Sequence, residues 1–431
     1  MSFNLIWKVF LIWLVLHFFL HTFITFFIGL ELSIIWLWKE FIVIWLFLAL
    51  LYFILKHKDI SFISRDKTIF YLEITFLLLI LYTFFINYFV INSSLTEYIY
   101  AFRYDFAWYL IFFIVYRLSY FIKPWEYLLK FYWKIIKVIL ILAILWYMII
   151  FAKPWWLQLF GYDNTIFEWE VWASPPAAYY TQYNQWFVRN QFVFERPINY
   201  WFFLVAFFPL FYVLYLRKRS FKKTWFWWWV YGFNVMSTFS RAAWWAWFVE
   251  LIILAMIDYR KNIKRFLKYI LLPISIIIAW FVYFAYDHVV WRQRSNTGHI
   301  QEVLIWWDMF TNSPIIWKWA WYVWPASFWW DGIEFNTENQ FLQIAVEFGI
   351  IWFLLWFAIY LFFVLYWFYA WYKADKKEKE NKYLIYLLAF SIWMLWLSIQ
   401  WMVLHSFVDN MIVFPFMFLF AIVIYLYRNK K

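Results

Sequence analysis

Apolar positions dominate the pattern along this chain, and they form long runs separated by short polar segments. A helix rises about 1.5 Å per residue, so roughly 20 apolar residues cross the ~30 Å hydrocarbon core of a bilayer. The pattern predicts about twelve membrane-spanning helices, near residues 9–37, 41–55, 69–91, 101–119, 135–152, 199–216, 224–239, 242–257, 269–286, 341–370, 384–402 and 410–427.

Composition fixes the class of protein that this pattern indicates. Hydrophobic residues make up 68% of the sequence and charged residues 14%, which excludes a soluble globule with a polar surface. We therefore expect an all-α polytopic integral membrane protein, with residues 1–431 forming a single membrane domain. Two long external loops, at about 153–198 and 287–340, interrupt the helices. Loops of this length are usually functional or disordered, and neither is of low complexity, so we favour function.

Lysine and arginine predict the orientation, because cytoplasmic loops retain them. About three quarters of the 37 Lys and Arg residues fall on one side, together with both ends of the chain. Both termini are therefore predicted to be cytoplasmic. We attribute the net charge of +12 to this topology and to contact with membrane lipids, and not to nucleic-acid binding. The first apolar run is too long for a signal peptide and lacks a cleavage site.

Several chemistries are excluded by residues that the sequence lacks. There is no cysteine, and hence no disulfide, thiolate ligand or cysteine nucleophile. No histidine pair has metal-ligand spacing, and no Walker or dinucleotide-binding motif occurs, so we expect neither a metal nor another cofactor. The chemistry must then come from the polar side chains themselves.

Several basic residues lie on the predicted external side, although Lys and Arg normally collect in cytoplasmic loops, so their position requires an explanation. Arginine suits phosphate because its guanidinium donates two parallel hydrogen bonds, so an anionic ligand at the outer face accounts for the set. Any single member could equally be a solvated residue. The external basic residues are Arg103, Lys153, Arg189, Arg196, Arg241, Arg292, Arg294 and Lys318.

Polar residues inside apolar runs are candidates for function. Glu250 lies near the middle of the eighth predicted helix, where a carboxylate is either functional or structurally paired. Asn339, Gln343 and Glu347 are spaced by four and share one helical face, which marks a cavity wall more often than a lipid face. Glu338, at the mouth of that helix, could be a base or could stabilise the helix N-terminus.

Histidines in the external segments are candidates for proton transfer. His299 lies in the second long loop, and a neutral imidazole can accept a proton from a sugar hydroxyl. A single loop histidine is also commonly an ordinary solvated residue. His405 and Asp409, before the last predicted helix, are comparable candidates.

The counts of tryptophan and glycine are reversed from ordinary usage. The chain has 39 tryptophans and 6 glycines, although glycine is normally about 7% of residues. We infer that many of these tryptophans are UGA codons that the source organism reads as glycine. Residues 317–325, W-K-W-A-W-Y-V-W-P, then become G-K-G-A-G-Y-V-G-P, an ordinary flexible loop. The alternative is an extremely aromatic membrane protein, since tryptophan collects at bilayer interfaces.

Four segments together resemble the O-antigen ligase and O-antigen polymerase superfamily of bacterial membrane enzymes. The first is the sequence A-F-R-Y-D-F at 101–106, and the second is V-R-N at 188–190 with R-P-I-N at 196–199. The third, T-F-S-R-A-A at 238–243, is similar to the family's T-x-S-R-[GA]-A. The fourth runs from Gly298-His299 through 314–316 to E-N-Q-F-L-Q at 338–343 and E-F-G at 347–349. Glycine at 317, 319, 321, 324 and 352 would improve that last match.

The resemblance implies transfer of a glycan from a polyprenyl-diphosphate carrier to a lipid or glycan acceptor. The reaction would be inverting and metal-independent, at the outer face of the bacterial cytoplasmic membrane, and would build polysaccharides of the cell envelope such as lipopolysaccharide. Under this resemblance Arg241, with Arg189 or Arg196, holds the departing diphosphate, and Glu338 or His299 is the base. The remaining expected substrate-binding residues are Arg103, Asn339 and Gln343.

Two departures from the family pattern leave the reaction open between ligase and polymerase. Ligases typically carry an arginine near the position of His299 and a histidine where Glu338 stands. A different class, a secondary transporter or a flippase for lipid-linked oligosaccharides, fits twelve helices equally well. Transporters tend to show two related halves, and the first and last six predicted helices show no such repeat.

The codons at Trp317, Trp319, Trp321, Trp324 and Trp352 test the recoding hypothesis. We expect UGA at these positions, and peptide mass spectrometry of the protein from its natural source should find glycine there. UGG at all five would refute the hypothesis.

Overall fold

The computed structural model describes the helices, three short strands and some of the connecting residues. For part of these, at the ends of elements and over some inner positions, only the backbone is described. The described residues are 38–90, 94–95, 98–99, 102, 106–122, 127–152, 163–166, 177–182, 187–192, 194, 197–216, 221–259, 272, 275, 283, 301, 304, 307–308, 311, 340–374, 381–401 and 410–429.

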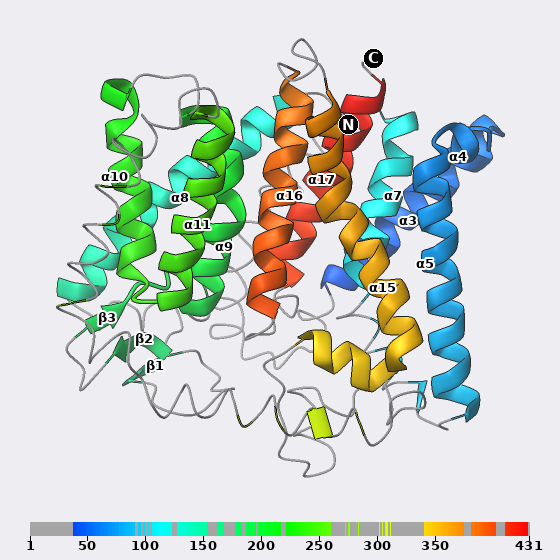
Figure 1. The fold of residues 1–431 in the computed structure, drawn as a ribbon, viewed down its shortest axis with the longest axis horizontal. Helices are drawn as coiled ribbons and strands as arrows, with labels where there is room; N and C mark the ends of the chain where they lie inside the picture. The colour runs from blue at the N-terminus through cyan, green and yellow to red at the C-terminus, as the bar shows by residue number, and fades with distance from the viewer. Residues whose placement is uncertain are drawn as a thin grey trace. The chain divides into compact units, whose positions relative to one another are not determined.

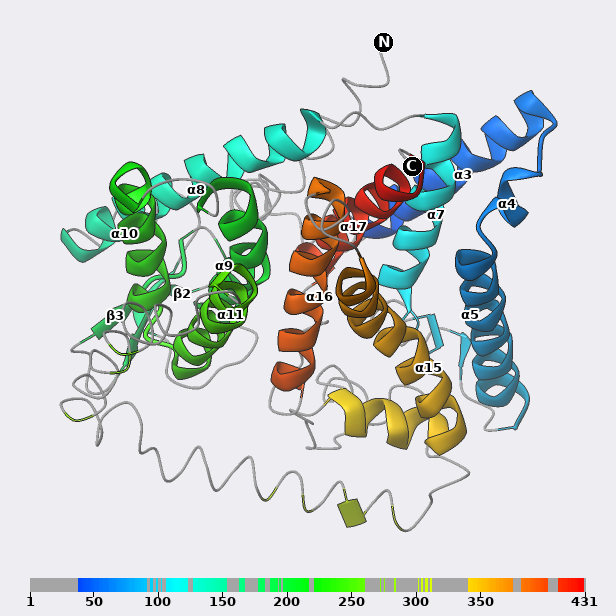
Figure 2. The same ribbon diagram turned by 45° about the horizontal axis from the view of Figure 1, so that its top comes forward.

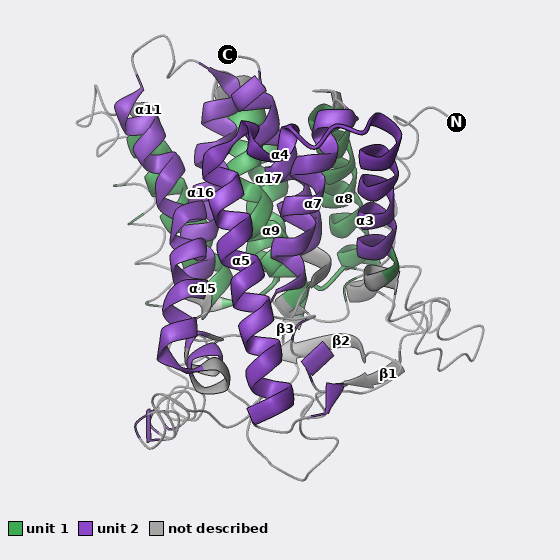
Figure 3. Cartoon of the chain, turned by 90° about the vertical axis from the view of Figure 1, so that its right-hand side faces the viewer, with its two compact units in different colours: residues 1–41, 124–292 green, residues 42–123, 293–431 purple. Residues whose placement is uncertain are grey.

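The chain divides into two compact units (Figure 3). Unit 1 comprises residues 1–41 and 124–292, and unit 2 comprises residues 42–123 and 293–431. Unit 2 is thus built from two segments of chain that unit 1 separates in the sequence. The expectation of a single membrane domain stays a prediction.

Unit 1 is a group of packed helices (Figure 1). Its elements are α8 (Tyr127–Ala152), α9 (Pro197–Phe211) with the π-helical turn η3 (Tyr212–Leu216), α10 (Phe221–Ser237) and α11 (Arg241–Tyr259). Helix α9 begins at Pro197, where the missing N–H costs nothing because the first amides of a helix have no partner in it. Helix α9 packs on α11, and α10 contacts both α8 and α11.

A small sheet forms within the first predicted external loop. Its strands are β1 (Asp163–Ile166), β2 (Ala177–Gln182) and β3 (Phe187–Arg189). Strand β2 is central, pairing in parallel with β1 and antiparallel with β3, and Tyr180 lies opposite Arg189. The sheet is the one departure from helix among the described elements. Strand β3 ends at Arg189 and places this residue beside the end of α10.

Unit 2 packs its last helix against one of its first. Its elements are α3 (Trp38–His57), α4 (Phe62–Arg65), α5 (Lys67–Phe85) with the π-helical turn η1 (Ile86–Val90), α7 (Ala107–Phe121), α15 (Gln340–Lys373), α16 (Lys382–Trp401) and α17 (Asn410–Asn429). Helix α17 packs on α7 and α16, while α15 packs on α16 and α5 (Figure 2). Most of α7 is buried, as are most described side chains of α17.

Ten of the twelve predicted apolar runs coincide with described helices; 9–37 lies outside the described residues, and so does 269–286 except for positions 272, 275 and 283. Among the described helices, the stretches Lys67–Val90 and Gly349–Lys373 are long and apolar enough to cross a membrane. Along the first, Leu77, Leu78 and Leu81 are each more than half exposed, as expected for a surface that faces lipid. The twelve-span topology stays a prediction.

Several tryptophans are crowded or lack a polar partner. Within the described part of the chain, the buried indole nitrogens of Trp133, Trp247, Trp367 and Trp396 have no hydrogen-bond partner, although buried indole N–H groups usually find one. The rings of Tyr82 and Trp352 lie 3.5 Å apart between centroids, and those of Trp393 and Phe416 lie 3.4 Å apart, closer than the ~4.5 Å lower limit of ordinary aromatic pairs. A smaller residue at such positions would remove both the crowding and the unpaired N–H group.

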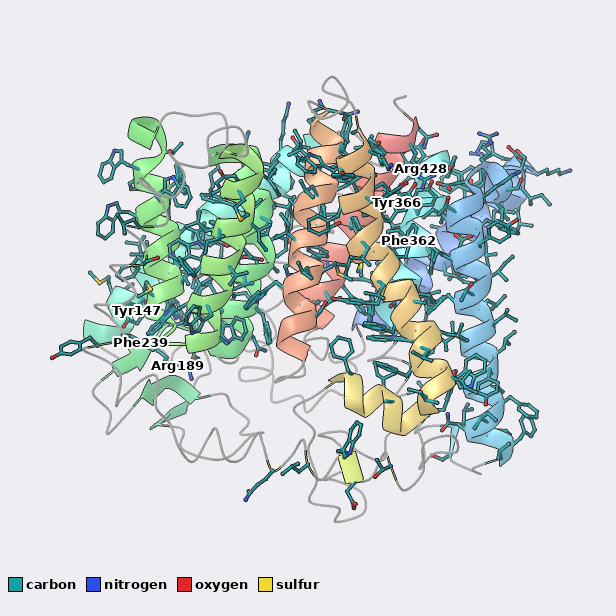
Figure 4. All side chains as sticks on the ribbon, viewed as in Figure 1. Tyr147, Arg189, Phe239, Phe362, Tyr366 and Arg428 are labelled. Atoms are coloured by element: carbon teal, nitrogen blue, oxygen red, sulfur yellow. The ribbon has the colours of Figure 1, made fainter. Side chains whose placement is uncertain are left out.

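Two ion pairs, each with one buried partner, join the elements of unit 2 at one end. Arg117 of α7 donates from Nε and Nη2 to the two carboxylate oxygens of Glu73 at 2.7 and 2.6 Å, and from Nη1 to the Phe62 carbonyl. Asp66 accepts one hydrogen bond of 3.0 Å from Arg428 at the end of α17 and another of 2.7 Å from the Tyr116 hydroxyl. Figure 4 shows Arg428 beside Tyr366, to whose hydroxyl it donates at 3.1 Å.

Glu73→Gln should destabilise unit 2, because it leaves the guanidinium of Arg117 buried without a counter-charge. Losing one partner of a buried ion pair costs about 3 kcal/mol or more. The measurement is the free energy of unfolding of the purified protein in denaturant.

Asp59→Asn is the matched control. Asp59 forms an exposed pair with Arg65, at 3.7 Å, and the hydrogen bonds from Ser61 lower the pKa of its carboxyl group. We expect no measurable change in stability from this variant. Equal effects of the two substitutions would contradict the assigned role of the buried pair.

Candidate functional site

The turn between α10 and α11 in unit 1 carries the sequence T-F-S-R-A-A and has a defined geometry. Helix α10 ends in a tight turn in which Thr238 and Phe239 donate to the carbonyls of Val235 and Met236. Phe239 has φ 47°, in the left-handed region that non-glycine residues rarely adopt, which reverses the chain direction. Ser240 then caps α11, its Oγ accepting from the Ala243 amide at 3.4 Å.

Residues 189 and 190, about 50 positions earlier, dock on this turn. The Asn190 amide donates to the Ser237 carbonyl at 2.8 Å, and its Nδ2 donates to Ser237 Oγ at 3.0 Å. Arg189 Nε donates to the Thr238 carbonyl at 2.8 Å. Figure 4 shows Arg189 and Phe239 at the same end of unit 1. The second and third segments of the family resemblance therefore meet in space.

A chain of hydrogen bonds between buried polar groups connects the turn to the interior of unit 1. Ser237 Oγ donates to the Asn234 carbonyl at 3.1 Å, and Asn234 Oδ1 accepts from the Tyr200 hydroxyl at 2.6 Å. Asn234 Nδ2 donates to the Leu140 carbonyl at 3.0 Å. These bonds link α8, α9 and α10 in an apolar interior, where a polar group without a partner would be costly. The turn is thereby held in one geometry.

The electrostatics of this turn favour an anion. Helix α11 starts at Arg241, so the positive end of its dipole lies at the turn. Arg189 adds a half-buried guanidinium to the same place. Two arginine positions at a helix N-terminus are suited to phosphate or diphosphate.

The second element of interest is α15 in unit 2, which is broken at Gly349. That residue has φ 74° and ψ 166°, a region of backbone space that is essentially restricted to glycine. The sequence predicts one continuous helix over 341–370, and this prediction is wrong, because the break divides α15 into two limbs (Figure 1). In membrane proteins broken helices occur where they are buried in protein or line a cavity.

Aromatic contacts hold the two limbs together. Phe341, in the first limb, packs edge-on against the rings of Trp356, Phe357 and Tyr360 in the second, with centroids 5.7 to 6.5 Å apart. Positions 343 and 347 lie, by helical register, on the face of the first limb opposite Phe341. The break therefore separates a short limb with a polar face from the long apolar limb.

The structure places some of the predicted site residues and leaves others outside the described part of the chain. Arg189 is placed with its side chain, and Arg241 and Gln343 are placed by their backbones. The structure brings Arg189 and Arg241 to the same turn of unit 1. The candidates outside the described residues are Arg103, Arg196, His299, Glu338, Asn339, His405 and Asp409.

Sequence reasoning missed the residues that support the turn. Asn190, Tyr200, Asn234 and Ser237 are buried and hydrogen-bonded, and none was singled out as a site residue. The residue that could have indicated this group from the sequence is Asn234. It is an amide in the middle of an apolar run, and such a residue needs a hydrogen-bond partner inside the protein.

The residues that the structure describes form a mainly helical protein, in which two helices are long and apolar enough to span a membrane and the first unit has an arginine-bearing turn. Comparisons with protein-family models, with curated proteins and with solved structures found no match.

Gly349→Ala should strain the break in α15, because alanine is disfavoured at φ 74° and ψ 166°. The expected loss of stability is about 1–3 kcal/mol, measured by unfolding in denaturant. Gly232→Ala is the matched control, since Gly232 lies within α10 and an added Cβ would meet Trp247 at an ordinary 3.6 Å. Alanine there should be neutral or slightly stabilising. A tolerated Gly349→Ala would show that the break is not fixed by its backbone.

Proposed function

We propose that this protein is a bacterial membrane enzyme that transfers or polymerises a glycan carried on a polyprenyl diphosphate, in the manner of O-antigen ligases and polymerases. The observation that carries the proposal is the docking of Arg189 and Asn190 on the turn that starts α11 at Arg241. Two segments of the family resemblance, far apart in the sequence, are thus parts of one structure.

The chemistry of this turn matches the leaving group of the reaction. Glycan transfer from a lipid carrier releases a polyprenyl diphosphate, and its developing negative charge must be stabilised by fixed cations and amide dipoles. Arg189, Arg241 and the N-terminus of α11 supply these groups. The attacking hydroxyl of the acceptor must lose a proton, a role for which we propose Glu338 or His299. Arg103, Arg196, Asn339 and Gln343 are proposed to bind the substrate.

Apolar and basic residues of unit 2 are distributed as expected for a protein of the cytoplasmic membrane. The stretch Lys67–Val90 is apolar, and the segment before it carries basic residues at positions 56, 58 and 65. Basic residues beside a spanning helix favour the cytoplasmic side and its anionic lipid. We therefore propose a multi-pass protein of the bacterial cytoplasmic membrane with both termini cytoplasmic.

A transporter or flippase is the second candidate, and the break at Gly349 favours it. Transporters commonly bind substrate where a spanning helix is interrupted. The two candidates differ in what accumulates when the protein is inactive. A flippase defect leaves the lipid-linked glycan on the cytoplasmic side. A transfer defect leaves it on the external side, as single repeats for a polymerase or as unattached chains for a ligase.

Arg241→Ala and Arg189→Ala should each reduce glycan transfer in cells that depend on this protein. A hydrogen bond to a charged group contributes about 1.5–3 kcal/mol, so the loss should be roughly ten- to a hundredfold. The measurement is the chain length and attachment of surface glycan, separated by electrophoresis, with protein insertion checked by immunoblot.

Arg65→Ala serves as the control, because Arg65 is exposed in α4 and pairs only weakly with Asp59. It should leave the glycan pattern unchanged. Normal glycan in an inserted Arg241→Ala protein would rule out the transfer function that we assign to this turn.

A further inference from the structure

Helix α11 carries a carboxyl group at its centre that no described cation neutralises. Glu250 is fully buried, with 0% of its surface exposed. Neither of its carboxyl oxygens accepts a hydrogen bond in the described part of the chain. The paired acids of unit 2 are different, since the buried Asp66 pairs with Arg428 and the half-buried Glu73 with Arg117.

The ionisable group that faces Glu250 is a tyrosine. Helix α11 packs on α9 and α10, and Tyr231 of α10 interacts with Glu250 on one side and with Tyr200 of α9 on the other. The Tyr231 hydroxyl donates to the Leu204 carbonyl, and the Tyr200 hydroxyl donates to Asn234. Both hydroxyl protons are therefore used in other hydrogen bonds and are not donated to Glu250. Among the described side chains of α9, α10 and α11 there is no lysine or arginine.

An ionised carboxylate in this position would be unstable. Removing a charge from water without a counter-charge or hydrogen bonds is far more costly than burying the neutral acid. A glutamine or a leucine would fill the same space with no such risk. The presence of a titratable group in the packed centre of three helices therefore requires an explanation other than stability.

We propose that Glu250 is a proton-binding site within the helical core of unit 1. Its carboxyl group holds a proton while α9, α10 and α11 are packed together. It releases the proton when α11 separates from α10 and water reaches the carboxyl group. Proton binding is thereby coupled to the packing of these helices, a common role for acids inside membrane helices.

This site is separate from the arginine-bearing turn. Nine residues along α11 from Arg241 correspond to ~13 Å, so Glu250 does not contact a ligand held at that turn. The proposal therefore stands whether or not the protein transfers glycans. Its test reads the proton itself and needs no substrate.

Infrared spectroscopy of the reconstituted protein at neutral pH, comparing the native chain with Glu250→Gln, is the direct test. A protonated carboxyl group has a C=O stretch well separated from that of a carboxylate. We expect the native protein to show this band and Glu250→Gln to lack it. Glutamine is neutral and of the same size, so the packing should be kept. A carboxylate signal lost in Glu250→Gln, with the protonated band unchanged, would falsify the proposal.

Labelling with dicyclohexylcarbodiimide gives a second test that needs no variant. In this reaction the carboxyl oxygen bonds to the central carbon of the reagent and the carboxyl proton moves to one of its nitrogens, so only a protonated acid reacts. Peptide mass spectrometry should find the adduct on Glu250, and Glu73, which is paired with Arg117, is the internal control. Labelling of Glu73 without Glu250 would overturn the proposal.

Discussion

Many polar groups buried in this apolar chain bond to partners inside the protein, and these bonds organise both units. In unit 1, Asn234 joins the hydroxyl of α9 to a carbonyl of α8, and so fixes three helices with one side chain. In unit 2, Asp66 joins the start of α5 to α7 and α17. Van der Waals contacts between apolar helices fit many registers, whereas these hydrogen bonds fit only one.

Hydrogen bonds of the same kind hold the arginine-bearing turn in one geometry. A turn between two helices would ordinarily be mobile. Here Arg189 donates to the Thr238 carbonyl and the backbone N–H of Asn190 donates to the Ser237 carbonyl. The side-chain amide of Asn190 also donates to the Ser237 hydroxyl. Donors whose positions are fixed before a ligand arrives stabilise developing charge without reorganisation.

The helices were largely predictable from the sequence because apolar runs specify them directly. Glu250 was expected near the middle of its helix and lies midway between Arg241 and Tyr259. The break at Gly349 was not predicted, because a single glycine in an apolar run does not by itself reveal a positive φ. The small sheet was also missed, since its strands are of three to six residues and carry no clear alternation.

The candidate site was predictable only in part. The motif around Arg241 and the segment around Arg189 could be picked out as short patterns, but nothing in their spacing along the chain indicated that they touch. Their contact depends on Asn190 and Ser237, which are common residue types in loops and helix ends. Long-range pairing of this kind is set by tertiary packing, which a local pattern does not encode.

The link between Asp66 and Arg428 has a consequence for the order of assembly. The two residues are 362 positions apart. Residues 124–292 of unit 1 lie between the two segments of unit 2 in the sequence, so they are synthesised before α17 is. The early helices of unit 2 can form this contact only after α17 has been made. Loss of the Arg428 side chain should thus weaken the packing of helices that are made first.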